Sequence, residues 1–404
     1  MSVTREPGIA PPVRKTNIVF VSLYSEMGGG EYATYNLLKN LDRDRFHPIV
    51  LFGGRGTFVD KVQSLGIETL IVPFQPVMLK ELVNPMVLRT VLKKSGEISR
   101  FLGGRDIDIV HCSDVFSLFL VLKSVLRSRM HVVFNIIFFY EWPRLILFNI
   151  LAIFFVNEIV TNSHAVARDV VRKTLFLKKR VRTVYCGVDA ALFRPRKHEE
   201  SDVLRRELGV GPGVKLVGMI ARFEPTKGHR IFLEAAAALK THSEIGFVAV
   251  GGVLFASVFP FFTECYKDVM RLRALMGLED RVVFLPHRDD IPDVIRSLDV
   301  VVCPSLCEGF GLVVLEALQS GVPVVASRAV GALEVAEGAP GVFVAETGNH
   351  VSLAEQILDA LDYRRRQSSV LGVRQFADSL REGIRDLTWE RFARNYESIY
   401  EKIV

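Results

Sequence analysis

The chain has 404 residues, of which 49% are hydrophobic and 24% charged, with 30 Gly and 17 Pro. These proportions are typical of globular proteins, so a disordered, collagen-like or coiled-coil chain is excluded, and the length predicts two or three domains with a cleft between two of them. The net charge of +6 is uneven, because residues 1–200 carry 28 Lys and Arg against 18 Asp and Glu.

Cysteines and the N-terminal residues indicate the compartment. There are too few cysteines for a disulfide framework, and they lack the CxxC spacing of a zinc site. The first 17 residues contain no apolar core of the ~7–15 residues that a secretory signal needs. We therefore expect a protein of the reducing cytoplasm. The cysteines are Cys112, Cys186, Cys265, Cys303 and Cys307.

The first half reads as alternating strands and helices. Residues 17–23 form an apolar β-branched run, a Gly-Gly-Gly loop follows at 28–30, and a helical pattern covers 31–41. The segments between the strands are long enough for crossover helices, which predicts a parallel sheet. Further strands are expected at 47–52, 67–72, 107–111, 131–135 and 158–162.

An apolar stretch at 145–156 is followed by the densest basic cluster, at 168–182. The stretch is interrupted by Asn149 and is shorter than the ~20 residues that span a bilayer, so we expect a buried helix or one that lies on a membrane surface. The cations fit an anionic lipid surface or, alternatively, a solvated helix face. No nucleic-acid-reading motif accompanies them, and we expect no nucleic acid partner.

The second half repeats the plan as a second parallel α/β domain. It opens with a strand at 215–220 and a helix at 228–239, and a polar linker at 194–202 precedes it. A final amphipathic helix covers about 389–404. The other expected strands lie at 246–250, 282–285, 300–303, 322–326 and 341–344.

The most informative segment is 301–327. A strand ending near Cys303 leads through a loop into a helix that begins near Gly311 and ends at Gly321, so Glu308 lies at the helix N-terminus and Glu316 lies within the helix. A helix start offers free N–H groups to a phosphate, and carboxylates accept ligand hydroxyls. The alternative interpretation is that Glu308 caps the helix and Glu316 is solvated.

Two cations lie in the loop after the first strand of the same domain, Arg222 and Lys227. Because the carboxyl ends of parallel strands line one crevice, this loop and the Glu308 loop are expected to face one site. Two cations beside a helix N-terminus predict a cradle for a diphosphate.

This combination resembles the retaining glycosyltransferases of family four, whose architecture is the GT-B fold. The resemblance is carried by Arg222 with Lys227, by Glu308 and Glu316 with Gly-Phe-Gly-Leu between them, and by the Pro-Val-Val-Ala-Ser run that begins at Pro323. It implies an α/β protein with two Rossmann-like parallel-sheet domains that face each other across a cleft. Supporting segments lie at 28–30, 158–163, 185–195, 281–285 and 288–292.

The resemblance also implies a division of labour. The first domain, 1–195, would bind the acceptor and be joined by the C-terminal helix at about 386–404, and the second, 196–385, would bind the donor. The expected reaction is transfer of a hexose-type sugar from a UDP- or GDP-linked donor to a hydroxyl of a lipid or a growing glycan. No cofactor and no metal are expected, and the enzyme would work in the cytoplasm or as a peripheral protein at the cytoplasmic face of a membrane.

Site residues follow from the same resemblance. Arg222 and Lys227 would hold the diphosphate and stabilise the leaving group, and Glu308 would hold the transferred sugar. Glu316 would bind the ribose, and the loop before Arg288 would meet the base. Glycines of the first domain would let its backbone approach the ligand. The implied donor-binding residues are Gly29, Gly30, Arg288, Gly309, Phe310, Gly311, Leu312 and Glu316.

Retention in this family is described as same-face attack assisted by the departing phosphate, so positioning and charge stabilisation replace a side-chain nucleophile. Two other functions fit the same fold, a sugar-nucleotide epimerase and a non-catalytic nucleotide-sugar-binding protein. One departure from the family is Ser113, where many relatives have a second histidine after the one equivalent to His111.

Other apparent motifs receive structural interpretations. Asp106 and Asp108 resemble a metal-binding DxD, but they stand at the start of a strand, away from the ligand edge. Cys303 and Cys307 are expected to be structural thiols, since no further soft ligands accompany them. The apolar run at 253–262 replaces a small polar loop that relatives often have, and it fits either an added contact with a membrane or a partner, or a covered core.

Overall fold

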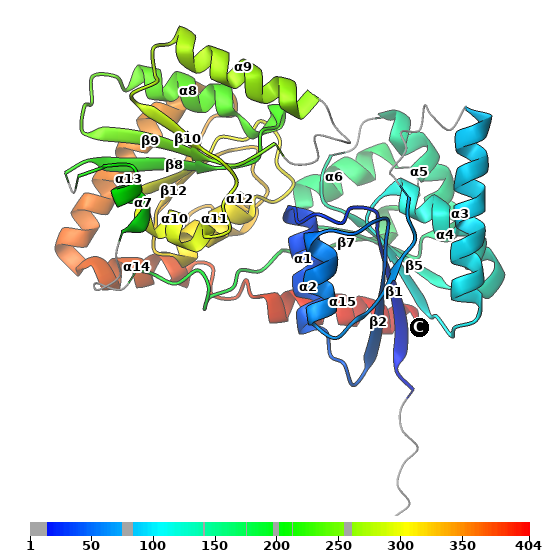
Figure 1. Cartoon of the computed structure of the whole chain (residues 1–404). Coiled ribbons are helices and arrows are strands. Elements are labelled where there is room, and N and C mark those ends of the chain that lie inside the picture. Colours follow the sequence, from blue (N-terminus) through cyan, green and yellow to red (C-terminus); the bar gives the residue numbers. More distant parts are fainter. Residues whose placement is uncertain are drawn as a thin grey trace, which may run out of the picture.

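The computed structural model describes residues 14–74, 84–139, 142–174, 176–196, 202–211, 213–253 and 261–404, with the backbone alone for 142–147. Within these residues the chain forms two parallel β-sheets, each covered by helices (Figure 1).

The first sheet has seven strands in the order β3-β2-β1-β4-β5-β6-β7. The chain leaves β1 in one direction and returns to its other side with β4, which makes a switch point between those two strands. The six expected strands are confirmed, and a seventh, β7, lies within the basic cluster. The strands are β1 (Thr16–Ser22), β2 (Phe46–Phe52), β3 (Glu68–Ile71), β4 (Ile109–Cys112), β5 (His131–Ile136), β6 (Glu158–Thr161) and β7 (Val181–Thr183).

Local capping defines the helices of this domain. The Asp114 side chain accepts a hydrogen bond from the Ser117 N–H at 2.8 Å in a capping box, at the start of the helix that begins at Val115. The Ser163 side chain accepts one from the Val166 N–H at 3.2 Å and caps the helix that begins at His164. The helices are α1 (Gly29–Asn40), α2 (Thr57–Ser64), α3 (Pro85–Gly103), α4 (Val115–Ser128), α5 (Trp142–Phe155), α6 (His164–Lys173) and the short 3₁₀ turn η2 (Lys178–Arg180).

The second sheet has six strands in the order β10-β9-β8-β11-β12-β13, so its switch point lies between β8 and β11. All expected strands of this half are present, with ends shifted by at most two residues. They are β8 (Lys215–Ile220), β9 (Ile245–Val250), β10 (Val282–Leu285), β11 (Val300–Cys303), β12 (Val324–Ser327) and β13 (Val342–Ala345).

The helices of the second half connect these strands and cover both faces of the sheet. The helix expected after the 304–311 loop is α11, and Gly321, with φ of 75°, follows its end. They are α7 (Val203–Glu207), η3 (Pro225–Lys227), α8 (His229–Ala238), α9 (Phe261–Leu275), α10 (Ile291–Ser297), α11 (Leu312–Gln319), α12 (Leu333–Ala336), α13 (His350–Leu371) and α14 (Val373–Glu382).

The last helix, α15 (Trp389–Ile403), returns to the first sheet (Figure 1). The Tyr400 hydroxyl lies 2.7 Å from His111 Nδ1, and the Tyr396 hydroxyl donates to Asn135 at 3.0 Å. These bonds place α15 against β4 and β5. The domain boundary expected at 195–196 adjoins residues 197–201, which lie outside the described residues, and it stays a prediction.

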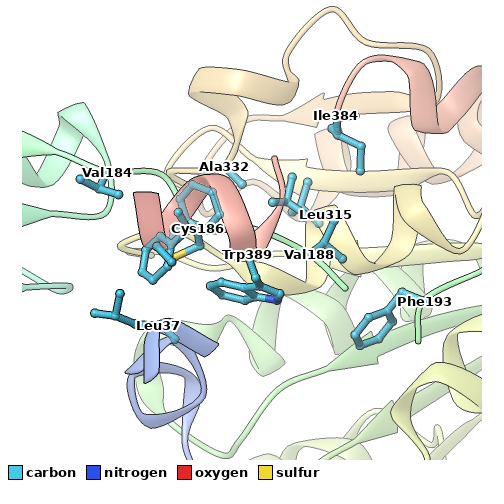
Figure 2. Close-up of a cluster of buried hydrophobic side chains, with 14 of the residues drawn as sticks. Leu37, Val184, Cys186, Val188, Phe193, Leu315, Ala332, Ile384 and Trp389 are labelled. Carbon is cyan, nitrogen blue, oxygen red and sulfur yellow. The ribbon is translucent and has the colours of Figure 1, made fainter. Parts of the chain in front are cut away.

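The two halves are joined by two chain segments that lie side by side, one at Val188 and the other at Leu387 and Thr388. The Val188 N–H donates to the Leu387 carbonyl at 2.9 Å, and Val188 also bridges to Thr388. Figure 2 shows the buried cluster around this crossing, which runs from Leu37 on α1 past Trp389 to Leu315 on α11. The core therefore continues from one domain to the other at the crossing, and burial of its apolar surface stabilises both.

Candidate active site

Two loops meet at the carboxyl edge of the second sheet, on either side of its switch point. The Leu306 N–H donates to the Thr226 carbonyl at 2.7 Å, which joins the loop after β11 to the loop after β8. The structure thereby brings Lys227 and Glu308 together, with Arg222 on the same loop as Lys227, at the edge where parallel strands are expected to leave a crevice.

Lys227 and Glu308 form an ion pair in this crevice. Lys227 Nζ donates to Glu308 Oε2 at 2.7 Å, and the Ser305 hydroxyl donates to the same oxygen at 3.2 Å. Burial alone would lower the pKa of Lys227, but the neighbouring Glu308 carboxylate outweighs it and holds the pKa above its usual value. The ammonium is therefore charged at neutral pH and held at the edge of the sheet.

Arg222 is held by an acid of its own loop. Its Nε donates to Glu224 Oε2 at 2.8 Å, and its guanidinium lies 5.7 Å from the centre of the Phe262 ring. Burial raises the pKa of Glu224, but Arg222 and Thr226 more than compensate, so the pKa is lowered. Glu224 thus stays ionised and orients the guanidinium.

Glu316 is a half-buried carboxyl that has no hydrogen bond or ion pair among the described residues. Burial raises its pKa to about 7. Burial and the charge of Glu316 raise the pKa of Tyr32, on α1 of the first domain, to about 12. A desolvated carboxylate without a partner is costly, which favours a ligand-binding role over a solvated one.

The Gly-Phe-Gly-Leu run forms the turn into α11. Gly311 is the N-cap residue with φ of 91°, Phe310 is buried, and Leu312 begins the helix. A Cβ atom at Gly309 would overlap the carbonyl oxygen of Ile137, which lies at the end of β5 in the first domain. The run therefore lies at the contact between the two domains.

The glycine loop of the first domain reaches the same place. Nothing lies within 4 Å of a Cβ at Gly29, whereas a Cβ at Gly30 would overlap the side chain of Ile137. Ile137 thus lies between the glycine loop and Gly309. We did not identify Ile137 from the sequence, because an apolar residue after a strand is usual in a core.

Glu31 is a second residue that the sequence interpretation missed. It lies directly after the glycine loop, on α1. Burial raises its pKa, and the charge of Arg222 in the other domain acts in the opposite direction. An acid directly after the glycine loop was the available signal. Glu31 thus interacts electrostatically with Arg222 across the two domains.

Arg288 has a different environment from the one expected. Its guanidinium makes paired hydrogen bonds to Asp290 at 2.8 Å and to Glu207 at 2.8 and 2.9 Å. These contacts raise the pKa of Arg288, with Asp290 the larger cause. The side chain shapes the loop after β10, and any contact of that loop with a base remains a prediction.

Asp106, Asp108 and His111 each have a side-chain partner in the structure. Asp106 and Asp108 pair with Arg14 at 2.6 and 3.0 Å, and among the described residues no three His, Cys, Asp or Glu side chains cluster as metal ligands. His111 is buried beside Tyr400, and burial lowers its pKa to about 3. Residues 254–260 of the apolar run lie outside the described residues.

Two family models match the chain. The model "Glycosyl transferases group 1" covers residues 200–370, and the model "Glycosyltransferase Family 4" covers residues 27–192. Together they include both strands at the switch point of the second sheet and every residue of the crevice described above.

Two relatives are similar in sequence to part of the chain. The D-inositol 3-phosphate glycosyltransferase of Corynebacterium efficiens is 31% identical over 55% of this chain and 51% of its own length, and the spore coat protein SA of Bacillus subtilis is 30% identical over 61% and 65%. The chain thus spans about half the length of the first of these relatives and under two thirds of the second.

Solved structures match over nearly the whole chain. Alr3699/HepE of Anabaena, in complex with UDP and glucose, has a TM-score of 0.77 with 22% identity over 96% of this chain and 100% of its own. A glycosyltransferase of Rickettsia africae has a TM-score of 0.79 with 21% identity over 97% and 99%. With matched models over both halves and this architecture, the chain belongs to the family-four glycosyltransferases, the glycosyl transferases group 1, and has the GT-B fold.

Proposed function

We propose that the protein is a retaining glycosyltransferase that moves a hexose-type sugar from a UDP- or GDP-linked donor to an acceptor hydroxyl. The observation that carries the proposal is the crevice itself, in which Arg222 and the Lys227–Glu308 pair lie in the loops beside α11, while the Glu316 carboxyl has no hydrogen bond or ion pair in the part of the chain that the structure describes. The solved complexes of Alr3699/HepE with UDP and with UDP-glucose support a uridine nucleotide as the first donor to test.

Cationic and anionic residues of the crevice would bind different parts of the donor. The diphosphate would take Lys227 and Arg222 as counter-charges together with the N–H groups at the start of α11. Glu316 would accept the ribose hydroxyls, and Glu308 would turn from Lys227 to a sugar hydroxyl. Transfer then needs no side-chain nucleophile, because the departing phosphate takes the acceptor proton and the protein stabilises the charge that develops.

Two other functions have the same fold. An epimerase would act on the nucleotide sugar without an acceptor, and a binding protein would return it unchanged. Incubation with a panel of UDP- and GDP-sugars, with and without glycan and lipid acceptors, separates the three by product analysis. Transfer only in the presence of an acceptor is expected, and an altered sugar without acceptor would contradict the proposal.

Metal independence is part of the proposal. Arg222, Lys227 and the start of α11 supply positive charge where a divalent ion would otherwise be needed. We expect the transfer rate in the presence of EDTA to stay within about two-fold of the untreated rate, since the phosphate charge is met by the protein. Complete loss of transfer, restored by magnesium or manganese alone, would contradict this expectation.

A surface of the first domain supports a lipid or lipid-linked acceptor. Among the described residues no helix is both long and apolar enough to cross a membrane. However, Ile150 and Phe154 are exposed on one face of α5, and Phe176, after α6, is 89% exposed with φ of 68°. Exposed apolar and aromatic side chains in a basic segment are typical of peripheral membrane contact.

The basic cluster contributes fewer cations to this surface than its sequence suggested. Arg180 donates to the carbonyls of Ala152 and Val156 at 3.0 and 2.7 Å, so it caps α5 instead of facing solvent. Lys173 pairs with Asp169 at 2.8 Å and Arg182 with Glu158 at 3.3 Å. The exposed cations of the cluster are Arg168, Arg172, Lys178 and Lys179, and the last three lie within four residues of Phe176 in the sequence.

Flotation with liposomes tests this surface. Binding is expected to rise with anionic lipid and to weaken with salt, and Lys178→Gln with Lys179→Gln should weaken it about 30-fold, since each cation near an anionic leaflet contributes about 1 kcal/mol. Lys267→Gln with Arg271→Gln on exposed α9 is the matched control and should leave binding unchanged. Equal recovery in the soluble fraction under all conditions would contradict membrane contact.

A further inference from the structure

One carboxylate of the second domain occupies a helix start of the first. Glu334, on α12, accepts the backbone N–H of His164 through one oxygen and that of Ala165 through the other, each at 2.6 Å. Both donors belong to the first turn of α6. The short distances are typical of hydrogen bonds to an ionised acceptor.

The N–H groups at the start of α6 can be accounted for one by one. The Val166 N–H donates to the Ser163 side chain at 3.2 Å, and the Ala167 N–H donates to the Ser163 carbonyl at 3.0 Å. The two that remain are those of His164 and Ala165, and Glu334 takes both. A carboxylate of the second domain therefore supplies the acceptors for two N–H groups at a helix start of the first domain.

The side chain of Tyr185 reinforces the contact through a hydrogen bond and edge-on or tilted ring contacts. The Tyr185 hydroxyl donates to Glu334 at 3.2 Å. The Tyr185 ring lies 5.7 Å from the His164 ring and 6.2 Å from the Phe310 ring, measured between centres. Burial and the Glu334 charge raise the pKa of Tyr185 to about 12, so the hydroxyl stays a donor at neutral pH.

The segment that carries Glu334 is also bound to the donor loop. The Gly331 N–H donates to the Glu308 carbonyl at 3.2 Å, and the Ala332 N–H donates to the Phe310 carbonyl at 2.7 Å. Residues 329–334 thus connect α6 of the first domain with the turn that holds Glu308. Movement of one domain against the other must break the bonds at Glu334 or move the donor loop.

We propose that Glu334 is a positioning residue, which holds the glycine loop and Ile137 of the first domain against the Gly309 turn in the arrangement that transfers sugar. The inference rests on the proposed function and extends it to a residue that touches no reacting atom. The side chains proposed to hold the nucleotide, Arg222, Lys227 and Glu316, lie in the second domain, so Glu334 should affect transfer more than nucleotide affinity.

Three variants test this role in the full chain. Glu334→Ala removes both acceptors, Glu334→Gln keeps one carbonyl oxygen without the charge, and Glu337→Ala is the control, because Glu337 is exposed three residues away and pairs only with Arg328 among the described residues. Hydrogen exchange followed by NMR measures the exchange rates of the His164, Ala165 and Val166 amides. Steady-state kinetics measure turnover, and calorimetric titration with UDP measures nucleotide affinity.

In Glu334→Ala the His164 and Ala165 amides should exchange at least about ten-fold faster, because their acceptor is lost. The Val166 amide, bonded within its own domain, should be unchanged. Turnover should fall at least about ten-fold while UDP affinity stays within about three-fold, and Glu334→Gln should recover part of the turnover.

The two possible failures are separable. Unchanged exchange at His164 and Ala165 would show that the contact is absent in solution, and faster exchange with normal turnover would show that it positions nothing; either result overturns the inference. If the wild-type protein transfers no sugar at all, the proposed function fails, and the exchange measurement still reports on the contact.

Discussion

Replacing Lys227 or Arg222 with alanine is expected to lower turnover by about ten- to a hundred-fold without unfolding the protein. Each side chain is expected to make a charge-assisted contact with the diphosphate, worth about 1.5–3 kcal/mol. Lys227→Ala should have the larger effect, because Glu308 then loses the ammonium that pairs with it at 2.7 Å and leaves a half-buried carboxylate next to the leaving group. Initial rates at saturating donor measure turnover, and thermal unfolding shows whether each variant is folded.

The matched control is Arg230→Ala. Arg230 follows Lys227 by three residues, but its side chain is exposed and pairs with Glu234 along α8. Its removal should leave turnover within about two-fold, since exposed ion pairs of this kind contribute little. Near-normal turnover in a folded Lys227→Ala or Arg222→Ala variant would rule out the diphosphate cradle.

The two glutamates of the 301–327 segment should have separable effects. Glu316→Ala is expected to weaken the binding of the free nucleoside diphosphate about ten-fold, because the ribose belongs to donor and product alike. Glu308→Ala should leave that affinity nearly intact and lower transfer at least about ten-fold, because the sugar is present only in the donor. Calorimetric titration and initial rates of both variants test the assignment, and interchanged effects would contradict it.

The pH dependence of stability gives an independent measurement on Glu316. Its pKa is about 7 in the folded protein against an ordinary value of 4.5, so the folded state binds this proton more tightly than the unfolded state does. The free energy of unfolding should therefore fall as the pH rises from about 4.5 to about 7. Glu316→Gln should flatten this fall, whereas the exposed Glu355→Gln should not.

Nucleotide affinity should also depend on the protonation of Glu316, but it should rise over the pH range in which stability falls. Ribose hydroxyls donate to the ionised carboxylate, so binding favours the deprotonated form of Glu316. Affinity is expected to rise with pH up to about 7 and then level off. An affinity that is independent of pH in the wild-type protein would place the ribose elsewhere.

The amino-acid sequence predicted all of the described strands but β7, their parallel arrangement and the edge of the second sheet at which Arg222, Lys227 and Glu308 lie. Runs of β-branched residues separated by helix-length segments predict parallel sheets, and the carboxyl ends of such strands meet at one edge. That rule alone brought Arg222 and Lys227 together with Glu308. The strand β7 was missed because it has three residues and contains a charged one, Arg182, so it gives no apolar pattern.

Partners of charged side chains were decided only by the tertiary structure. Lys227 and Glu308 are 81 residues apart, and Glu334 and His164 are 170 apart, so no local pattern pairs them. Hydrophobic periodicity reports which residues are buried, but not which carboxylate meets which donor. The engagement of Arg288 with Glu207 and of Arg180 with the end of α5 follows the same rule, because each depends on how two distant segments pack.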